Sequence, residues 1–167
     1  MQVAAMVCRE GMAGRVVAVE RSSKRAETLR QILATSGADA VTTVLNCDFL
    51  DVLPSSHPEV QYLVVDPSCS GTGMALRGGG DTEPPGQDRL DRLAGLQARL
   101  LRHALAFPGA LGVVYSTCAT SATENEAVVA AVVGGCPGWR VREGVLPGWG
   151  RRGNPYQVSQ EHWSDFN

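Results

Sequence analysis

The sequence lacks several patterns that would assign it to a well-defined class of protein. Its five cysteines are odd in number and widely spaced, form no C-x-x-C pair and follow no secretory signal, so we expect a reducing compartment. Its three histidines, His57, His103 and His162, do not lie at the short paired spacings that structural zinc requires. We therefore expect no metal site.

Long apolar runs and an excess of positive charge are also missing. No apolar run approaches the roughly 18 residues of a membrane span, so we expect no membrane partner. The formal net charge is -2, and charge alone therefore favours a small molecule or a protein over a nucleic acid as the partner. The 167 residues are 44% hydrophobic, which predicts a single domain over 1–167 with a substantial core.

Two apolar stretches end in similar polar loops. The run from Tyr62 to Val65 meets Asp-Pro-Ser-Cys-Ser-Gly at 66–71, and the run over 111–115 meets Ser-Thr-Cys at 116–118. The first pattern predicts a buried strand that delivers polar groups at its carboxyl end, where open α/β sheets bind their ligands. Each of the two predicted strands therefore leads into a loop that carries a cysteine.

The first third of the chain predicts alternating helices and strands. A helix is expected over 2–10, and a short apolar strand over 15–20 ends in Glu20. Ser22 is well placed to cap the helix that follows, because its hydroxyl can accept a backbone N–H of the first turn. A β-branched strand over 41–45 is followed by Asn46, Cys47 and Asp48. The apolar face of the helix after Ser22 should consist of Ala26, Leu29, Ile32 and Leu33.

The remaining segments continue the alternation. Residues 75–88 are rich in turn formers and predict a mobile loop that could cover a site. Apolar residues over 89–107 have helical spacing, and the opposite face carries three arginines, which we interpret as solvated rather than as phosphate contacts. These are Arg92, Arg99 and Arg102. A helix capped by Thr123 or a neighbour should extend to Val133, and a last strand is expected over 139–145.

This alternation predicts an α/β fold with a doubly wound parallel sheet. Such a sheet would bring three carboxylates, Glu20, Asp48 and Asp66, and the two loop cysteines, Cys69 and Cys118, to one edge. A carboxylate after the second strand of such a fold binds a ribose diol, and one after the third commonly meets an adenine amine. Taken singly, each acid is better explained as a helix cap or a solvated loop residue. The three together favour a nucleoside-containing cofactor.

The two cysteine loops resemble motifs four and six of the NOL1/NOP2/Sun family of S-adenosylmethionine-dependent RNA cytosine-C5 methyltransferases. The resemblance is carried by Asp-Pro-Ser-Cys-Ser-Gly at 66–71, Tyr-Ser-Thr-Cys at 115–118, Glu-Asn-Glu at 124–126, Glu20 with Arg25, and Asp48. It implies a Rossmann-like class I methyltransferase fold that uses S-adenosyl-L-methionine. Within the family the chain most resembles the Sun-domain member-five type, which implies large-subunit ribosomal RNA as the partner and the nucleus or nucleolus as the location.

The resemblance also implies a role for each site residue. It assigns to Cys118 the attack on C6 of cytosine, which makes C5 nucleophilic enough to accept a methyl group. It assigns to Cys69 help with release of the methylated base, and to Asp66 the binding of the cytosine edge or of the cofactor. The implied cofactor-binding residues are Glu20, Arg25, Asp48 and Asp66.

The chain departs from the family in ways that bear on its activity. Family members carry a first strand and a loop of the type Ala-Pro-Gly-x-Lys-Thr before the helix expected at 2–10, and this sequence contains neither. The family's N-terminal RNA-binding extension and final hairpin are not recognisable, and Glu20 replaces the usual Asp. In a sheet ordered 3-2-1-4-5 the first strand is central, so its loss would expose the edges of two neighbours. We therefore expect an incomplete methyltransferase domain without its first strand and glycine loop.

Three interpretations stay open on these grounds. The chain is part of an active enzyme, or it is a catalytically inactive truncated paralogue or isoform that at most binds RNA or a protein, or it is an unrelated redox or nucleotide-binding α/β module. The absence of C-x-x-C, and of G-x-G-x-x-G after a strand, argues against the third. Apart from the family, a free cysteine is more often a small buried hydrophobe, and we keep that interpretation for Cys8, Cys47 and Cys136.

Overall fold

The computed structural model describes residues 14–74, 85–142 and 148. The chain divides into two compact units, Met1–Leu53 and Pro54–Asn167, which are described separately. The helix predicted over 2–10 lies outside the described residues, as do the loop at 75–84 and most of the last predicted strand. That residues 1–167 form one domain stays a prediction.

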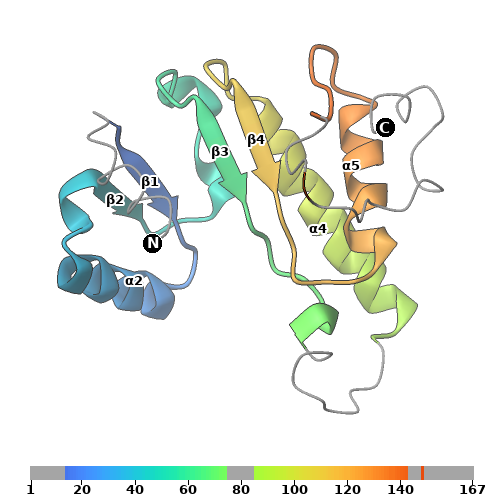
Figure 1. Cartoon of the computed structure of the whole chain (residues 1–167), viewed down its shortest axis with the longest axis horizontal. Helices are drawn as coiled ribbons and strands as arrows, with labels where there is room; N and C mark the ends of the chain where they lie inside the picture. The colour runs from blue at the N-terminus through green and yellow to red at the C-terminus, as the bar shows by residue number, and fades with distance from the viewer. Residues whose placement is uncertain (1–13, 75–84, 143–147, 149–167) are drawn as a thin grey trace. The chain divides into compact units, whose positions relative to one another are not determined.

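The first unit contains two parallel strands joined by a helix (Figure 1). Strand β1 (Val16–Val19) pairs with β2 (Thr42–Leu45), and helix α2 (Ser23–Ser36) packs against β2. The side chain of Ser22 accepts the backbone N–H of Arg25, so the predicted N-cap is confirmed. The core is formed by Leu33 and Ala38, with Val16, Leu29, Val41 and Val44 packed against them.

One residue predicted for the apolar face of α2 does not lie in the core. Ala26 and Leu33 are buried, but Ile32 is 41% exposed. Ile32 directly precedes Leu33 in the helix, and one residue is a rotation of roughly 100° about the axis. A helix that packs on only one side buries a narrow stripe, so the prediction for Ile32 was wrong.

The second unit repeats the same plan. Strands β3 (Tyr62–Val65) and β4 (Gly112–Tyr115) are parallel neighbours, and the chain between them forms helix α4 (Gln87–Leu105). Helix α5 (Glu126–Val133) lies beside α4 (Figure 1), and Leu101, Val128 and Val132 form the core between these elements. Short 3₁₀ turns complete the two units: η1 (Asp39–Val41), η2 (Phe49–Asp51), η3 (Pro54–Ser56) and η4 (Ala122–Glu124).

The prediction that the run over 62–65 is buried was only half right. Leu63 and Val65 are buried, but Tyr62 is 72% exposed and Val64 is 58% exposed. Successive strand residues point to opposite faces, and α4 covers one face of this sheet. The other face stays open among the described residues, so an unbroken apolar run did not indicate burial on both sides.

Three smaller differences concern the ends of elements. Helix α4 begins at Gln87, inside the segment predicted as loop. Thr123 lies within η4, and its neighbour Ser121 is the N-cap of that turn, whereas α5 has no side-chain cap. Residues 139–142 form no strand, and the rest of the strand predicted there lies outside the described residues.

None of the helices among the described residues combines the length and the apolar character needed to cross a membrane.

The described strands form two separate two-stranded sheets, β1 with β2 and β3 with β4. Both pairs are parallel, and β4 follows β3 through a helix, as the predicted α/β alternation requires. Among the described strands, pairing occurs only within each pair, so a single doubly wound sheet stays a prediction. That the first strand of the family is missing stays a prediction.

Candidate active site

The two loop cysteines meet at the carboxyl ends of neighbouring strands. Val65 at the end of β3 lies opposite Tyr115 at the end of β4, so the loops that follow leave the same edge of the sheet. The sulfur atoms of Cys69 and Cys118 lie 3.1 Å apart, and the side chain of Cys118 is exposed to solvent. The structure therefore brings together the two cysteines that the sequence predicted for one edge.

Direct hydrogen bonds join the two loops beside the cysteines. The backbone N–H of Gly73 donates to the carbonyl of Cys118 (2.9 Å), and the N–H of Thr120 donates to the hydroxyl of Thr72 (2.9 Å). A Cβ atom at Gly73 would lie 2.8 Å from the Cys118 carbonyl oxygen, so only glycine permits this approach. Gly71 has φ +74, a left-handed conformation that side chains rarely adopt.

The fully buried carboxylate of Glu124 holds the Cys69 loop through hydrogen bonds. Oε1 of Glu124 accepts the backbone N–H of Ser70 (2.9 Å) and the side-chain amide of Gln97 (3.0 Å). The same amide nitrogen of Gln97 donates to the carbonyl of Ser68 (3.0 Å). Ser68 and Ser70 flank Cys69, so the backbone on both sides of this cysteine is bound to buried side chains.

The next residue, Asn125, supports the Cys118 loop in a similar way. Its Oδ1 accepts the hydroxyl of Thr117 (2.6 Å), and its Nδ2 donates to the carbonyls of Ala119 (3.2 Å) and Ser121 (2.9 Å). The hydroxyl of Tyr115 donates to the backbone carbonyl of Glu124 (2.6 Å). Burial and the charge of Glu124 raise the pKa of Tyr115 well above its ordinary value, so the phenol stays protonated as this donor.

The environment of Cys118 favours its protonated form. The hydrogen bond with Cys69 is the largest cause that raises the pKa of Cys118, followed by desolvation. The negative charge of Asp66, whose side chain is exposed, makes a smaller contribution in the same direction. The charge of the predicted third site residue therefore also favours the protonated form of Cys118.

The first unit presents a second group of polar residues, at the carboxyl ends of β1 and β2. Oε1 of Glu20 accepts the backbone N–H of Ser22 (2.6 Å) and the guanidinium of Arg25 (2.9 Å). The Ser22 N–H is the largest cause that lowers the pKa of Glu20, and Arg25 lowers it further, while partial desolvation opposes both. Both contacts use Oε1, which leaves Oε2 for a ligand. The structure thus brings together Glu20 and Arg25, two of the residues predicted to bind the cofactor.

Asp48 follows β2 at the same edge of the β1–β2 sheet. One of its oxygens caps η2 by accepting the N–H of Leu50 (3.0 Å), and the other faces the exposed guanidinium of Arg21 at 3.5 Å. The side chain of Asn46 donates to the carbonyls of Glu20 (2.8 Å) and Arg21 (3.1 Å). Asn46 therefore fixes the turn that presents Glu20, a role that the sequence did not indicate.

The other cysteines agree with the interpretation given to them where they are described. Cys136 is partly buried and packs against the Leu101, Val128 and Val132 cluster, as a small hydrophobe would, and Cys47 is partly buried as well. Cys8 lies outside the described residues. Across the described ranges, His, Cys, Asp and Glu side chains do not gather in groups that could hold a metal ion.

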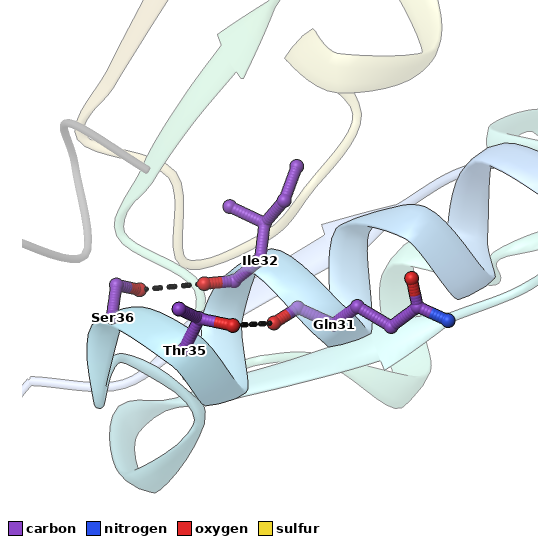
Figure 2. Close-up of a pocket in the computed structure, with 4 residues that line it drawn as sticks. All are labelled: Gln31, Ile32, Thr35 and Ser36. Atoms are coloured by element: carbon purple, nitrogen blue, oxygen red, sulfur yellow. Dashed lines mark hydrogen bonds between the residues drawn. The ribbon is translucent and has the colours of Figure 1, made fainter.

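A pocket in the first unit lies away from the carboxylates and is a poor ligand site. It is lined by Gln31, Ile32, Thr35 and Ser36 in the last turns of α2 (Figure 2). The hydroxyls of Thr35 and Ser36 donate to the carbonyls of Gln31 and Ile32 within the same helix. These hydroxyls are already bonded to the backbone of the helix, whereas Glu20 and Asp48 follow the carboxyl ends of β1 and β2, and the end of β1 leads into the first turn of α2.

The family described as 16S rRNA methyltransferase RsmB/F matches residues 3–147 of the chain. The chain belongs to this family. The match includes both cysteine loops and the Glu20 and Asp48 loops, so the two polar strand-end regions are both family segments.

Several relatives whose names state a function match most of the chain. A 25S rRNA (cytosine-C(5))-methyltransferase of Schizosaccharomyces pombe is 37% identical over 154 residues, which cover 87% of this chain and 33% of the relative. A 28S rRNA (cytosine-C(5))-methyltransferase of Mus musculus is 38% identical, covering 89% and 33%. A human protein described as a putative methyltransferase is 35% identical, covering 89% and 48%. The chain therefore spans about a third of the length of the first two relatives and about half of the third.

Proposed function

We propose that this chain carries the catalytic cysteines of an S-adenosyl-L-methionine-dependent RNA cytosine-C5 methyltransferase, with large-subunit ribosomal RNA as its substrate. The observation that carries the proposal is the Cys69–Cys118 pair, 3.1 Å apart after two neighbouring parallel strands. Membership of the RsmB/F family supports the reaction type, and the names of the fungal and mouse relatives support large-subunit RNA.

Methylation of C5 explains why a site would hold two thiols. C5 of cytosine is a poor nucleophile, and addition of the Cys118 thiolate to C6 converts it into an enamine-like carbon. After the methyl group is attached, the C5 proton must leave and the bond between C6 and the Cys118 sulfur must break. The neighbouring Cys69 thiol is the group in contact with Cys118 that can assist this release.

The resting state of the pair sets one requirement on this reaction. The pKa of Cys118 is raised, chiefly by its hydrogen bond with Cys69, so the thiol proton must leave before or during attack. Asp66 is exposed, and its charge contributes to the raised pKa of Cys118. In the proposed site Asp66 binds the cytosine edge, and a proton or a hydrogen-bond donor supplied at N3 stabilises the negative charge that develops in the ring.

The polar groups of the first unit fit the nucleoside part of the cofactor. Glu20 stays ionised beside Arg25 and has one carboxylate oxygen without a recorded contact, which suits a ribose diol. Asp48 offers an acceptor oxygen after the next strand, where an adenine amine commonly binds. S-adenosyl-L-methionine, when bound, supplies the methyl group as an electrophile.

The proposal extends to the missing strand and to the location of the protein. In the family's sheet order a central strand would join the β1–β2 and β3–β4 pairs, and we infer that the described residues do not include it. The alternative is that the chain is a catalytically inactive truncated paralogue or isoform, which at most binds RNA or a protein. An enzyme that modifies large-subunit ribosomal RNA would act in the nucleolus, which a fluorescent fusion tests directly.

A chimera provides the decisive experiment. This chain replaces the matched region of the mouse relative, and methylation of single-stranded or looped RNA from the large subunit is measured with isotopically labelled cofactor. Cys118→Ala should abolish both methylation and any covalent RNA complex. Cys69→Ala should stall release and accumulate a protein–RNA adduct that survives denaturing electrophoresis.

The outcomes separate the proposals. Activity in the chimera but not in the 167-residue chain supports an enzyme segment that needs a strand supplied from elsewhere. An inactive chimera with an active mouse parent supports the alternative of an inactive paralogue. An adduct trapped by Cys118→Ala and lost with Cys69→Ala would reverse the two roles.

A further inference from the structure

Two adjacent residues, Glu124 and Asn125, connect the backbone beside both cysteines. Glu124 accepts the N–H of Ser70, which follows Cys69 in the chain. Asn125 accepts the hydroxyl of Thr117 and donates to the carbonyl of Ala119, the two neighbours of Cys118. A short segment at the start of α5 therefore holds the loops on both sides of the sulfur pair.

Gln97 completes the support on the Cys69 side. Its amide nitrogen donates to the carbonyl of Ser68 and to Oε1 of Glu124, both at 3.0 Å. Gln97 and Glu124 are fully buried, so no bulk water competes for these hydrogen bonds. Gln97 comes from the middle of α4, which ties the loop to the helix that covers the sheet.

Gln97 and Glu124 are unfavourable residues to bury in a core, because each leaves a polar atom without a partner in the described part of the chain. The second oxygen of each, Oε1 of Gln97 and Oε2 of Glu124, is buried and has no hydrogen-bond partner among the described residues. Two apolar side chains of similar volume would fill the same space without these two unpaired oxygens. What such residues would not supply is an acceptor for the Ser70 N–H and a donor for the Ser68 carbonyl.

We propose that Glu124, supported by Gln97, is a positioning residue that sets the distance between the sulfur atoms of Cys69 and Cys118, while Asn125 fixes the Cys118 side. The inference rests on the proposed function for what the two thiols do, but the distance itself can be measured without any methylation. In the reaction both thiols act on one cytosine, and a displacement of about 1 Å at a reacting group costs on the order of 100-fold in rate.

The test measures how closely the two thiols approach each other. Phenylarsine oxide reacts with two neighbouring thiols to form two As–S bonds and release water, and its affinity follows the effective concentration of the second thiol. Binding to the reduced 167-residue chain is measured for the wild type, Glu124→Leu, Glu124→Gln and Gln97→Leu. Cys69→Ala defines the affinity of a single thiol, and Arg99→Leu, on the exposed side of α4, is the matched control for Gln97→Leu.

Each variant has an expected result. Glu124→Leu removes the acceptor for Ser70 and should weaken arsenical binding by roughly 10- to 100-fold, towards the single-thiol level. Gln97→Leu should weaken it by about 3- to 10-fold, because Glu124 still holds Ser70. Glu124→Gln keeps a carbonyl acceptor in the same place and should stay within about 3-fold of the wild type.

Three results would overturn the inference. The first is unchanged binding in both leucine variants, the second is a loss in Glu124→Gln as large as in Glu124→Leu, and the third is a wild type that binds like Cys69→Ala. Where Glu124→Leu gives no thermal unfolding transition, Gln97→Leu and Glu124→Gln decide the question.

In an active chimera, Glu124→Leu should lower kcat and leave KM for S-adenosyl-L-methionine unchanged. An inactive wild-type chimera that still shows the arsenical pattern would reject the proposed function and leave the positioning role standing.

Discussion

The chemistry of the candidate site depends on a contact between two thiols that alters the protonation of Cys118. The hydrogen bond with Cys69 is the main reason that the pKa of Cys118 is raised, which is the opposite of what a nucleophilic thiol needs at rest. This hydrogen bond, in which either sulfur can be the donor, favours the protonated form of Cys118. The pair is therefore a resting arrangement, and the thiol proton of Cys118 must move when the cytosine binds.

Replacing Cys69 should make Cys118 more reactive towards a general alkylating agent. Cys69→Ala removes the largest cause that raises the pKa of Cys118, so alkylation by iodoacetamide should reach its half-maximal rate at a lower pH than in the wild type. Peptide mass spectrometry resolves the modification of Cys118 from that of other cysteines. Cys47→Ala is the control and should leave the profile unchanged. A profile that moves to higher pH in Cys69→Ala would contradict the assignment.

A second prediction at the residue scale concerns Glu20 and acid. Its pKa is lowered in the folded chain, so the stability it contributes is present above the ordinary value of 4.5 and is lost as the pH falls through the lower folded value. Because Arg25 is largely exposed, Glu20→Gln should cost at most about 1 kcal/mol at pH 7. Urea unfolding should show the wild type and the variant converging below pH 4.5. Glu27→Gln, on the exposed side of α2, serves as the control.

The same carboxylate should matter for the cofactor. Glu20→Gln removes the charge that the ribose hydroxyls would meet, so S-adenosyl-L-methionine should bind the chimera roughly 10-fold more weakly, the loss expected of a charged hydrogen bond. Calorimetry measures the affinity directly. Equal binding by the wild type and the variant would show that the cofactor does not use the end of β1.

The sequence predicted the polar residues at the strand ends better than the residues that support them. Cys69 and Cys118 could be placed together because each follows an apolar run, and parallel neighbours present their loops at one edge. Gln97 was not predicted to be buried because glutamine is a residue type that mostly lies at the surface. It lies four residues from both Leu93 and Leu101, so the helical period itself placed a polar residue on the buried face.

At the scale of elements, the contact between the two cysteine loops depends on a glycine. The N–H of Gly73 binds the Cys118 carbonyl, and an added Cβ would come within 2.8 Å of that oxygen, which belongs to backbone and cannot rotate away. Gly73→Ala should therefore push the loops apart and weaken phenylarsine oxide binding by roughly 10-fold, by lowering the effective concentration of the second thiol. Gly95→Ala, in α4 with no atom near its Cβ, is a matched control. An unchanged affinity in Gly73→Ala would show that the loops tolerate the shift.

The order of the elements could be predicted from the sequence, but which face of each element is buried could not. All four described strands lie within one residue of the predicted runs, because short apolar segments bounded by Gly, Pro and polar residues mark strands well. Burial depends instead on what packs against each face. Val64 looks the same in the sequence as Val65, yet Val65 lies under the helices and Val64 faces outward. Periodicity could not distinguish them, since both are apolar and adjacent.

At the scale of the whole molecule, the described sheets leave apolar surface and backbone edges without partners. Val64 and Val114 are opposite each other in the β3–β4 register and are each 58% exposed, and Tyr62 on the same face is 72% exposed. Neighbouring apolar residues on a two-stranded sheet with open edges favour association with other chains. These three residues, Tyr62, Val64 and Val114, form an exposed apolar row. This row is the feature of the 167-residue chain that most directly predicts its behaviour in solution.

The 167-residue chain on its own should consequently self-associate. Sedimentation velocity at increasing concentration should show a growing fraction of larger species, and the double variant Val64→Thr and Val114→Thr should reduce that fraction, because both changes keep β-branched side chains and remove apolar surface. Ile32→Thr removes an exposed apolar side chain of α2 and should have a smaller effect, since it does not lie on the β3–β4 face. The chimera should remain monomeric under the same conditions if the parent protein's own segments cover the row. A monomeric 167-residue chain with a sharp cooperative melt would instead show that the exposed apolar row does not drive association and that the chain folds without a further strand.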